Sequence, residues 1–137
     1  MQKLIILPLF LLFLTACSPK VWEKTPDGVL IHPKSKAVNG AKTVSLQVIS
    51  DRIIRVVASP DNQLSNAKSL CVVENKALPA TFSVVEQNDS LILTTAKVKV
   101  KVSMASGEVK FYDENNQVIL QDRNHGKSFI PITVEGT

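Results

Sequence analysis

Carboxylate side chains are the first candidates for chemistry in this sequence, because two carboxylates on a rigid frame can act as nucleophile and general acid. Asp113 and Glu114 are adjacent, and neighbouring residues at a strand end point apart, so a turn role is favoured over a catalytic pair. Asp122, Arg123 and His125 cluster after an apolar run and could reach a bound ligand. A solvated loop with local hydrogen bonds fits these three residues better. We therefore assign no catalytic residue to this chain.

The sequence does not contain a complete set of side chains for binding a metal or a cofactor. His32 precedes Pro33 and has no partner at the spacing of metal ligands. Two His and one free Cys do not make a zinc site, which needs three or four ligands. Cys71 lies in an apolar run with Val72 and is expected to be a buried thiol. We expect no metal, and no residue is assigned to a cofactor.

Cys17 is the residue whose surroundings specify a reaction. Lys3 and the apolar run 4–14 are typical of a signal peptide, which we place at 1–16, since a membrane-spanning helix needs about 20 apolar residues. The signal ends in Leu14-Thr15-Ala16-Cys17, which resembles a bacterial lipobox. The thiol of Cys17 would take a diacylglyceryl group and the new N-terminus a further acyl chain, which together anchor stably. A chance cysteine behind an ordinary signal peptide is the alternative.

The predicted lipidation of Cys17 places the protein in the bacterial cell envelope as a membrane-anchored lipoprotein, on the periplasmic face or the cell surface. The next residues, 17–28, are expected to form a tether, because they contain Pro19, Pro26 and Gly28 and show no periodicity. Trp22 lies in this tether. It could stack on a sugar ring, although packing against its own domain is favoured.

The remainder, 29–137, is rich in β-strand signals. Val and Ile outnumber Leu and Ala after residue 40, and runs such as Val44, Leu46 and Val48 alternate with polar residues. Turns are expected at 50–51, 59–62, 87–90, 105–107 and 113–116. Strands are expected near 29–32, 42–50, 52–58, 70–74, 80–86, 90–95, 97–103, 107–112, 117–121 and 128–134.

Many short strands without a convincing helix predict an all-β fold, an antiparallel β-sandwich with polar faces toward water. Lys97, Lys99 and Lys101 alternate with valines. They could bind an anionic polysaccharide, although a solvated strand face or a protected sheet edge is favoured.

Size and charge exclude several classes of protein. The chain of 137 residues suits one domain, whereas a complete (β/α)8 barrel needs about 200 residues or more. Lys and Arg total 16 against 12 Asp and Glu, and no basic block stands out. Nucleic acid is therefore not expected as a partner, because nucleic-acid-binding domains gather their basic residues on one face.

The order of strands and turns resembles one known family. The run from Thr43 to Ala58 (TVSLQVISDRIIRVVA) is followed by Ser59-Pro60, as in a strand pair of that family. The stretch from Leu91 to Leu120 adds two alternating strands, a Gly turn, VKFYD at 109–113 and a polar hairpin before VIL at 118–120. This pattern is similar to the N-terminal domain of glycoside hydrolase family 31, over most of residues 21–134.

The resemblance implies a galactose-mutarotase-like sandwich and a role in carbohydrate metabolism. The family includes α-glucosidases and α-xylosidases, whose two catalytic Asp residues lie on a following (β/α)8 barrel. This sequence does not include such a barrel, so we expect none of its acidic residues to take these catalytic roles, and whether the chain is part of an active enzyme stays open. We expect a non-catalytic N-terminal domain whose partner is the catalytic barrel of the same enzyme.

A freestanding envelope lipoprotein that binds glycan or a protein partner is the alternative. Sugar-binding sandwiches usually present two or three exposed aromatic residues. Outside the signal peptide the aromatic residues are Trp22, Phe82, Phe111, Tyr112 and Phe129. Phe82 and Phe111 are expected in the core by their alternation, so few aromatic residues remain to stack on a sugar. This favours the non-catalytic N-terminal domain over the freestanding lipoprotein. Whether carbohydrate is also a partner stays open.

Completeness of the sandwich is a further expectation. In the resembled family the sandwich continues beyond the position of Thr137 and then packs on the barrel. The segment 18–137 alone is therefore expected to be marginally stable, with some apolar side chains poorly covered. The residues expected to be poorly covered are Ile92, Val98, Val100, Val118 and Ile119.

Overall fold

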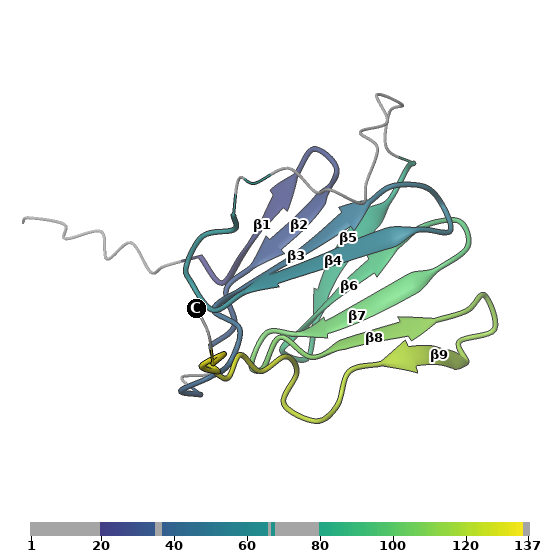
Figure 1. The fold of residues 1–137 in the computed structure, drawn as a ribbon. Coiled ribbons are helices and arrows are strands. Elements are labelled where there is room, and N and C mark those ends of the chain that lie inside the picture. The colour runs from purple at the N-terminus through teal and green to yellow at the C-terminus, as the bar shows by residue number, and fades with distance from the viewer. Residues whose placement is uncertain (1–19, 35–36, 66, 68–79, 136–137) are drawn as a thin grey trace, which may run out of the picture.

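Two antiparallel sheets make up the described part of the computed structural model, which comprises residues 20–34, 37–65, 67 and 80–135. The first sheet contains β1 (Trp22–Thr25), β2 (Gly28–Ile31), β3 (Thr43–Val48) and β4 (Ile54–Ser59). The second contains β5 (Ser83–Gln87), β6 (Ser90–Thr94), β7 (Lys99–Ser103), β8 (Val109–Tyr112) and β9 (Val118–Gln121). Strands follow chain order within each sheet, and the sheets lie face to face (Figure 1). The predicted all-β sandwich is confirmed.

Alternating side chains explain why these segments form strands. Val44, Leu46 and Val48 of β3 are buried, and Ser45 and Gln47 between them face outward. Thr43, at the start of the strand, is also buried. In β7, Val100 and Val102 are buried while Lys101 between them is exposed. The apolar rows of both sheets therefore meet in one core.

Short turns set the register of the hairpins. β5 and β6 are joined by Asn88 and Asp89, whose φ angles of 49° and 56° are those of a tight primed turn. Asn and Asp tolerate this left-handed conformation better than most residues. The turns expected at 50–51, 105–107 and 113–116 also lie between paired strands, at β3–β4, β7–β8 and β8–β9.

Two expected elements differ from the structure, and a third lies on residues that the structure does not describe. The tether expected at 17–28 is wrong for its second half, because Trp22–Thr25 forms β1 and pairs with β2. The strand expected at 128–134 does not form; Ser128 makes an isolated bridge with Gly40, and Pro131 has no N–H for a ladder. The strand expected at 70–74 lies outside the described residues.

Burial corrects part of the expectation about uncovered side chains. Val100 is fully buried, because the first sheet covers the inner face of β7, and Ile92 and Val98 are half-buried. Val118 and Ile119 are exposed, as expected, at 52% and 61%.

The two open edges of the sandwich differ in chemistry. At the β1–β5 edge, Trp22 Nε1–H donates to Glu86 Oε2 over 2.8 Å, and the Lys24 ammonium lies 5.0 Å from the Phe82 ring centroid. At the other edge, β9 pairs with β8 and with no other described strand, and Leu120 is 62% exposed. Polar and cation–π contacts thus bridge one edge, whereas the other presents apolar side chains to solvent.

Substitution of Gly28 by alanine tests the close approach of the β2 and β3 backbones. A Cβ at this position would lie 1.8 Å from the Leu46 carbonyl oxygen, so the backbone of two core strands would have to move apart. We expect Gly28→Ala to lower the free energy of unfolding by about 3 kcal/mol or more, measured by chemical denaturation.

Gly40→Ala is the matched control. Its nearest neighbour would be the Ala37 Cβ at 3.1 Å, and Ala37 is exposed and has room to shift. Equal stability of the two variants would contradict this account of the β2–β3 contact.

Candidate functional site

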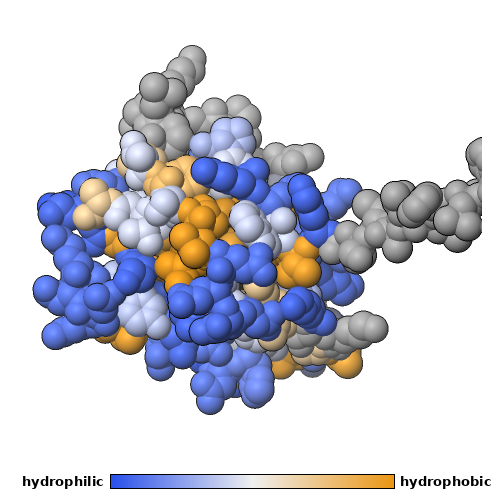
Figure 2. Space-filling view, turned by 180° about the vertical axis from the view of Figure 1, so that it is seen from behind, coloured by the Kyte–Doolittle hydropathy of each residue, from blue (hydrophilic) through white to orange (hydrophobic). Residues whose placement is uncertain are grey.

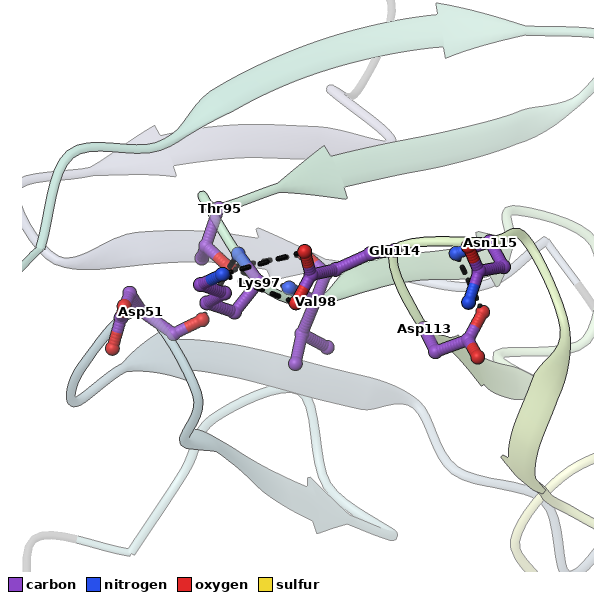
Figure 3. Close-up of polar contacts among 7 residues, drawn as sticks. All are labelled: Asp51, Thr95, Lys97, Val98, Asp113, Glu114 and Asn115. Atoms are coloured by element: carbon purple, nitrogen blue, oxygen red, sulfur yellow. Dashed lines mark hydrogen bonds and ion pairs between the residues drawn. The ribbon is translucent and has the colours of Figure 1, made fainter.

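Asp113 and Glu114 have separate structural partners at the turn between β8 and β9 (Figure 3). Asp113 Oδ1 accepts hydrogen bonds from the backbone N–H groups of Asn115 and Gln117, both over 2.8 Å. Glu114 Oε1 forms an ion pair with Lys97 Nζ at 3.2 Å. The two carboxylates therefore hold two hairpins, and the expected turn role is confirmed.

Thr95 is a structural residue that the sequence analysis missed. Its hydroxyl donates to the Asp51 carbonyl oxygen over 2.6 Å and accepts from the Val98 N–H over 3.0 Å. The side chain is buried and joins the β6–β7 turn to the β3–β4 turn, as Figure 3 shows. Asp51 lies 44 positions away, so no local pattern could have revealed this contact.

A polar hollow of about 220 Å³ lies beside Thr95. Its cationic side chains already have acceptors: Lys97 pairs with Glu114, and Lys99 Nζ donates to Asn116 Oδ1. The side chains around the hollow therefore join two turns. Among these four residues, each charged side chain already has a partner and none is left unpaired for a ligand.

Asp122, Arg123 and His125 form the solvated loop that their sequence suggested. Asp122 Oδ2 accepts from the Val109 N–H at 2.9 Å and from Lys127 Nζ at 2.5 Å. Arg123 and His125 are exposed, and the Arg123 carbonyl oxygen accepts from the Gly126 N–H over 3.0 Å. Asp122 thus fixes the loop to β8.

The other candidate residues are not brought together. His32 is half-buried, with Nδ1 3.4 Å from both Thr43 Oγ1 and the Lys42 carbonyl oxygen. Cys17 and Cys71 lie outside the described residues. Within the described ranges, no three His, Cys, Asp or Glu side chains form a group that could hold a metal ion. Over the same ranges, no helix has the length and apolar character needed to cross a membrane.

The lysines of β7 lie on the outer face of the second sheet. Lys101 is exposed opposite Lys110, which pairs with Glu108 at 3.1 Å. This confirms a solvated strand face. The alternative of a protected sheet edge is wrong, because β7 lies between β6 and β8.

The rear view of the molecule shows apolar side chains gathered in the middle and hydrophilic side chains around them (Figure 2). On the outer face of the second sheet, Val85 of β5 pairs with Ile92 of β6, and Val85 is 57% exposed.

The largest exposed apolar groups lie on β9 and in the segment after it. We call Val118, Ile119 and Leu120 the β9 surface; each is more than half exposed. Ile130, Ile132 and Val134 in the segment 129–134 are exposed at 69%, 82% and 59%. Large apolar side chains that stay exposed together on an edge strand such as β9 mark an interaction surface more often than a free one.

Comparison with known proteins identifies the domain. The family described as glycosyl hydrolase 31 N-terminal galactose mutarotase-like domain matches residues 43–131. The chain belongs to this family. The galactose-mutarotase-like sandwich and the family 31 resemblance expected from the sequence are thereby confirmed.

A solved structure agrees with this assignment. The crystal structure of the GH31 α-xylosidase from Xanthomonas citri is 38% identical in sequence and matches with a TM-score of 0.68. The match covers 83% of this chain and 12% of the α-xylosidase chain. This family 31 N-terminal domain therefore corresponds to a small part of the enzyme that it resembles.

Asp122 provides a test of the loop geometry. Asp122→Ala removes the acceptor of the Val109 N–H, and Val109 is only 2% exposed, so that donor would stay buried without a partner. We expect a loss of about 1–3 kcal/mol in the free energy of unfolding, measured by urea denaturation.

Asp122→Asn is the control, because its amide oxygen can still accept from Val109. It should retain most of the stability that Asp122→Ala loses. If both substitutions cost the same, the ion pair with Lys127 rather than the backbone bond fixes the loop.

Proposed function

We propose that this chain acts as the non-catalytic N-terminal domain of a family 31 α-glycosidase and supports the enzyme's catalytic domain. The match of residues 43–131 to the family of such domains is the observation that carries the proposal. The candidate carboxylates agree with it, since Asp113, Glu114 and Asp122 all bind structural partners. The related α-xylosidase suggests an α-xyloside substrate for the whole enzyme.

The β9 surface is the proposed contact with the catalytic domain. Among the strands that the structure describes, β9 has a hydrogen-bonded neighbour on one side, so its outer edge can meet another part of the enzyme. Each large apolar side chain removed from water contributes roughly 1.5–3 kcal/mol. Successive side chains of a strand point to opposite faces, so a domain that covers one face of β9 would bury one or two of these three side chains and stabilise the docked state by a few kcal/mol.

A chimera tests this contact. This chain would replace the matching residues of the Xanthomonas citri α-xylosidase, and hydrolysis of an aryl α-xyloside and thermal unfolding would be measured. Leu120→Asp places a charge in the proposed apolar contact, which should cost about 2 kcal/mol or more of docking free energy. We expect a lower unfolding midpoint and lower activity for this variant.

Val38→Asp is the matched control, because Val38 is a 96% exposed apolar residue of the loop between β2 and β3 and not part of β9. It should leave the chimera unchanged. A chimera that does not fold, or one that tolerates Leu120→Asp as well as Val38→Asp, would contradict the proposed role.

We further propose that the protein is anchored to a bacterial membrane through acylated Cys17 and lies in the cell envelope. The support is the apolar run 4–14 followed by Leu14-Thr15-Ala16-Cys17. Several acyl chains hold a protein on a bilayer stably, where one chain binds only marginally.

Cys17→Ser is expected to abolish acylation, because serine lacks the thiol that takes the lipid. In a bacterial host, the variant should leave the detergent phase or accumulate as precursor, and intact-mass measurement should show no lipid. Cys71→Ser removes the only other cysteine and should leave acylation unchanged. An unmodified Cys17 in a processed chain would refute the anchor.

A further inference from the structure

A hollow of about 500 Å³ lies at the β1–β5 edge, at the opposite side of both sheets from β9. The volume is within the range of roughly 300–1,000 Å³ found for small-molecule sites. Its lining includes Trp22, Glu86, Lys34 and the buried Met104. No role assigned above uses this hollow.

Trp22 supplies an aromatic wall that is held in place. The side chain packs against the core and also lines the hollow, so it has one protein-facing and one hollow-facing side. Its Nε1–H donates to Glu86 Oε2 over 2.8 Å, which fixes the ring across the two edge strands. A fixed half-buried indole offers an apolar face without a further entropic cost of ordering.

Polar groups surround this aromatic wall. Glu86 Oε2 is engaged by Trp22, whereas Glu86 Oε1 accepts no hydrogen bond from the described residues. Lys34 donates to Asp89 over 2.6 Å and keeps further N–H groups at the rim. The hollow thus offers both a hydrogen-bond acceptor and donors beside an apolar face.

The charges around the hollow nearly balance. The cationic side chains of its lining are Lys20, Lys24 and Lys34, and the acidic ones are Glu23 and Glu86, with Asp89 paired to Lys34. Lys24 is also directed to the Phe82 ring. A balanced set of charges favours a neutral ligand over an anion.

A second hollow extends the first along the same edge. It measures about 580 Å³, is lined by Phe82 and Pro26 among others, and shares Lys24 with the first. The β1–β5 edge therefore offers room for an extended ligand with Trp22 near one end and Phe82 near the other.

We propose that the β1–β5 edge binds a short neutral oligosaccharide, with one pyranose ring stacked on Trp22. A pyranose ring combines an apolar C–H face with a rim of hydroxyl groups. Its face would contact the indole, one hydroxyl would donate to Glu86 Oε1, and another would accept from Lys34. This site goes beyond the support role proposed above and does not depend on it.

Tryptophan fluorescence of the full chain tests the site, because Trp22 is the chain's only tryptophan. Maltotriose and xylotetraose are the neutral probes, and oligogalacturonate is the acidic one. Saturable change of the emission with a neutral probe, and a weaker response to oligogalacturonate, is the expected result. No response to either neutral probe, or a preference for the acidic probe, would overturn the proposal.

Substitutions separate binding from folding. Trp22→Leu should weaken binding about ten-fold in calorimetry, and Trp22→Tyr should restore part of it, because an aromatic face returns. Glu86→Gln keeps an acceptor for Trp22 and should weaken binding several-fold while the unfolding midpoint stays unchanged. Because this variant retains the edge contact, it remains informative even if Trp22→Leu fails to fold.

Tyr112→Leu is the matched control, since Tyr112 is a half-buried aromatic residue on β8, away from the β1–β5 edge. It should bind the neutral probe as the unmodified chain does. Equal affinity of Glu86→Gln and the unmodified chain would overturn the assignment of Glu86, and equal affinity of Trp22→Leu would overturn the site.

Discussion

Contact between two rows of aliphatic side chains holds the sandwich together, because among the described strands no β-ladder joins one sheet to the other. Val44 and Leu46 from β3 and Leu93 and Val100 from the second sheet are fully or almost fully buried in this layer. The hydrophobic effect is not directional, so it fixes the spacing of the sheets but not their relative angle. The twist of each sheet and the interdigitation of the inner side chains set the angle, and directional contacts reinforce it at the ends and edges.

Those directional contacts are few and come from residues far apart in sequence. Thr95 and Asp51 join two turns, and Trp22 and Glu86 join the edge strands over a separation of 64 positions. Hydrogen bonds of this kind add little net free energy each, but a missing partner for a buried group is costly. The core thus supplies most of the stability, while these side chains reinforce one arrangement of the two sheets.

Periodicity in the sequence predicted the parts of the fold that depend on local pattern. Val44, Leu46 and Val48 alternate with polar residues, and Asn88-Asp89 favours a tight turn, so β3 and the β5–β6 hairpin could be located. β1 was missed because Trp22–Thr25 is short and contains one apolar residue. The strand at 128–134 was expected wrongly, because its apolar composition says nothing about whether a neighbouring strand is available. Likewise, alternation showed which way Val100 points but not that the other sheet covers it.

The same limit explains why the candidate sites were only partly predictable. Asp113 and Asp122 bond to groups within a few positions or across one hairpin, so their turn and loop roles follow from local sequence. Packing of Trp22 against its own domain could be expected from the sequence, but its partner Glu86 carries no local signal. The two edges differ in the chemistry of their side chains and therefore suit different partners. Polar groups beside an aromatic ring suit a hydroxylated ligand, whereas the exposed aliphatic side chains of β9 suit another apolar surface. The edge proposed to contact the catalytic domain and the edge proposed to bind a sugar are therefore formed by different edge strands, β9 and the β1–β5 pair.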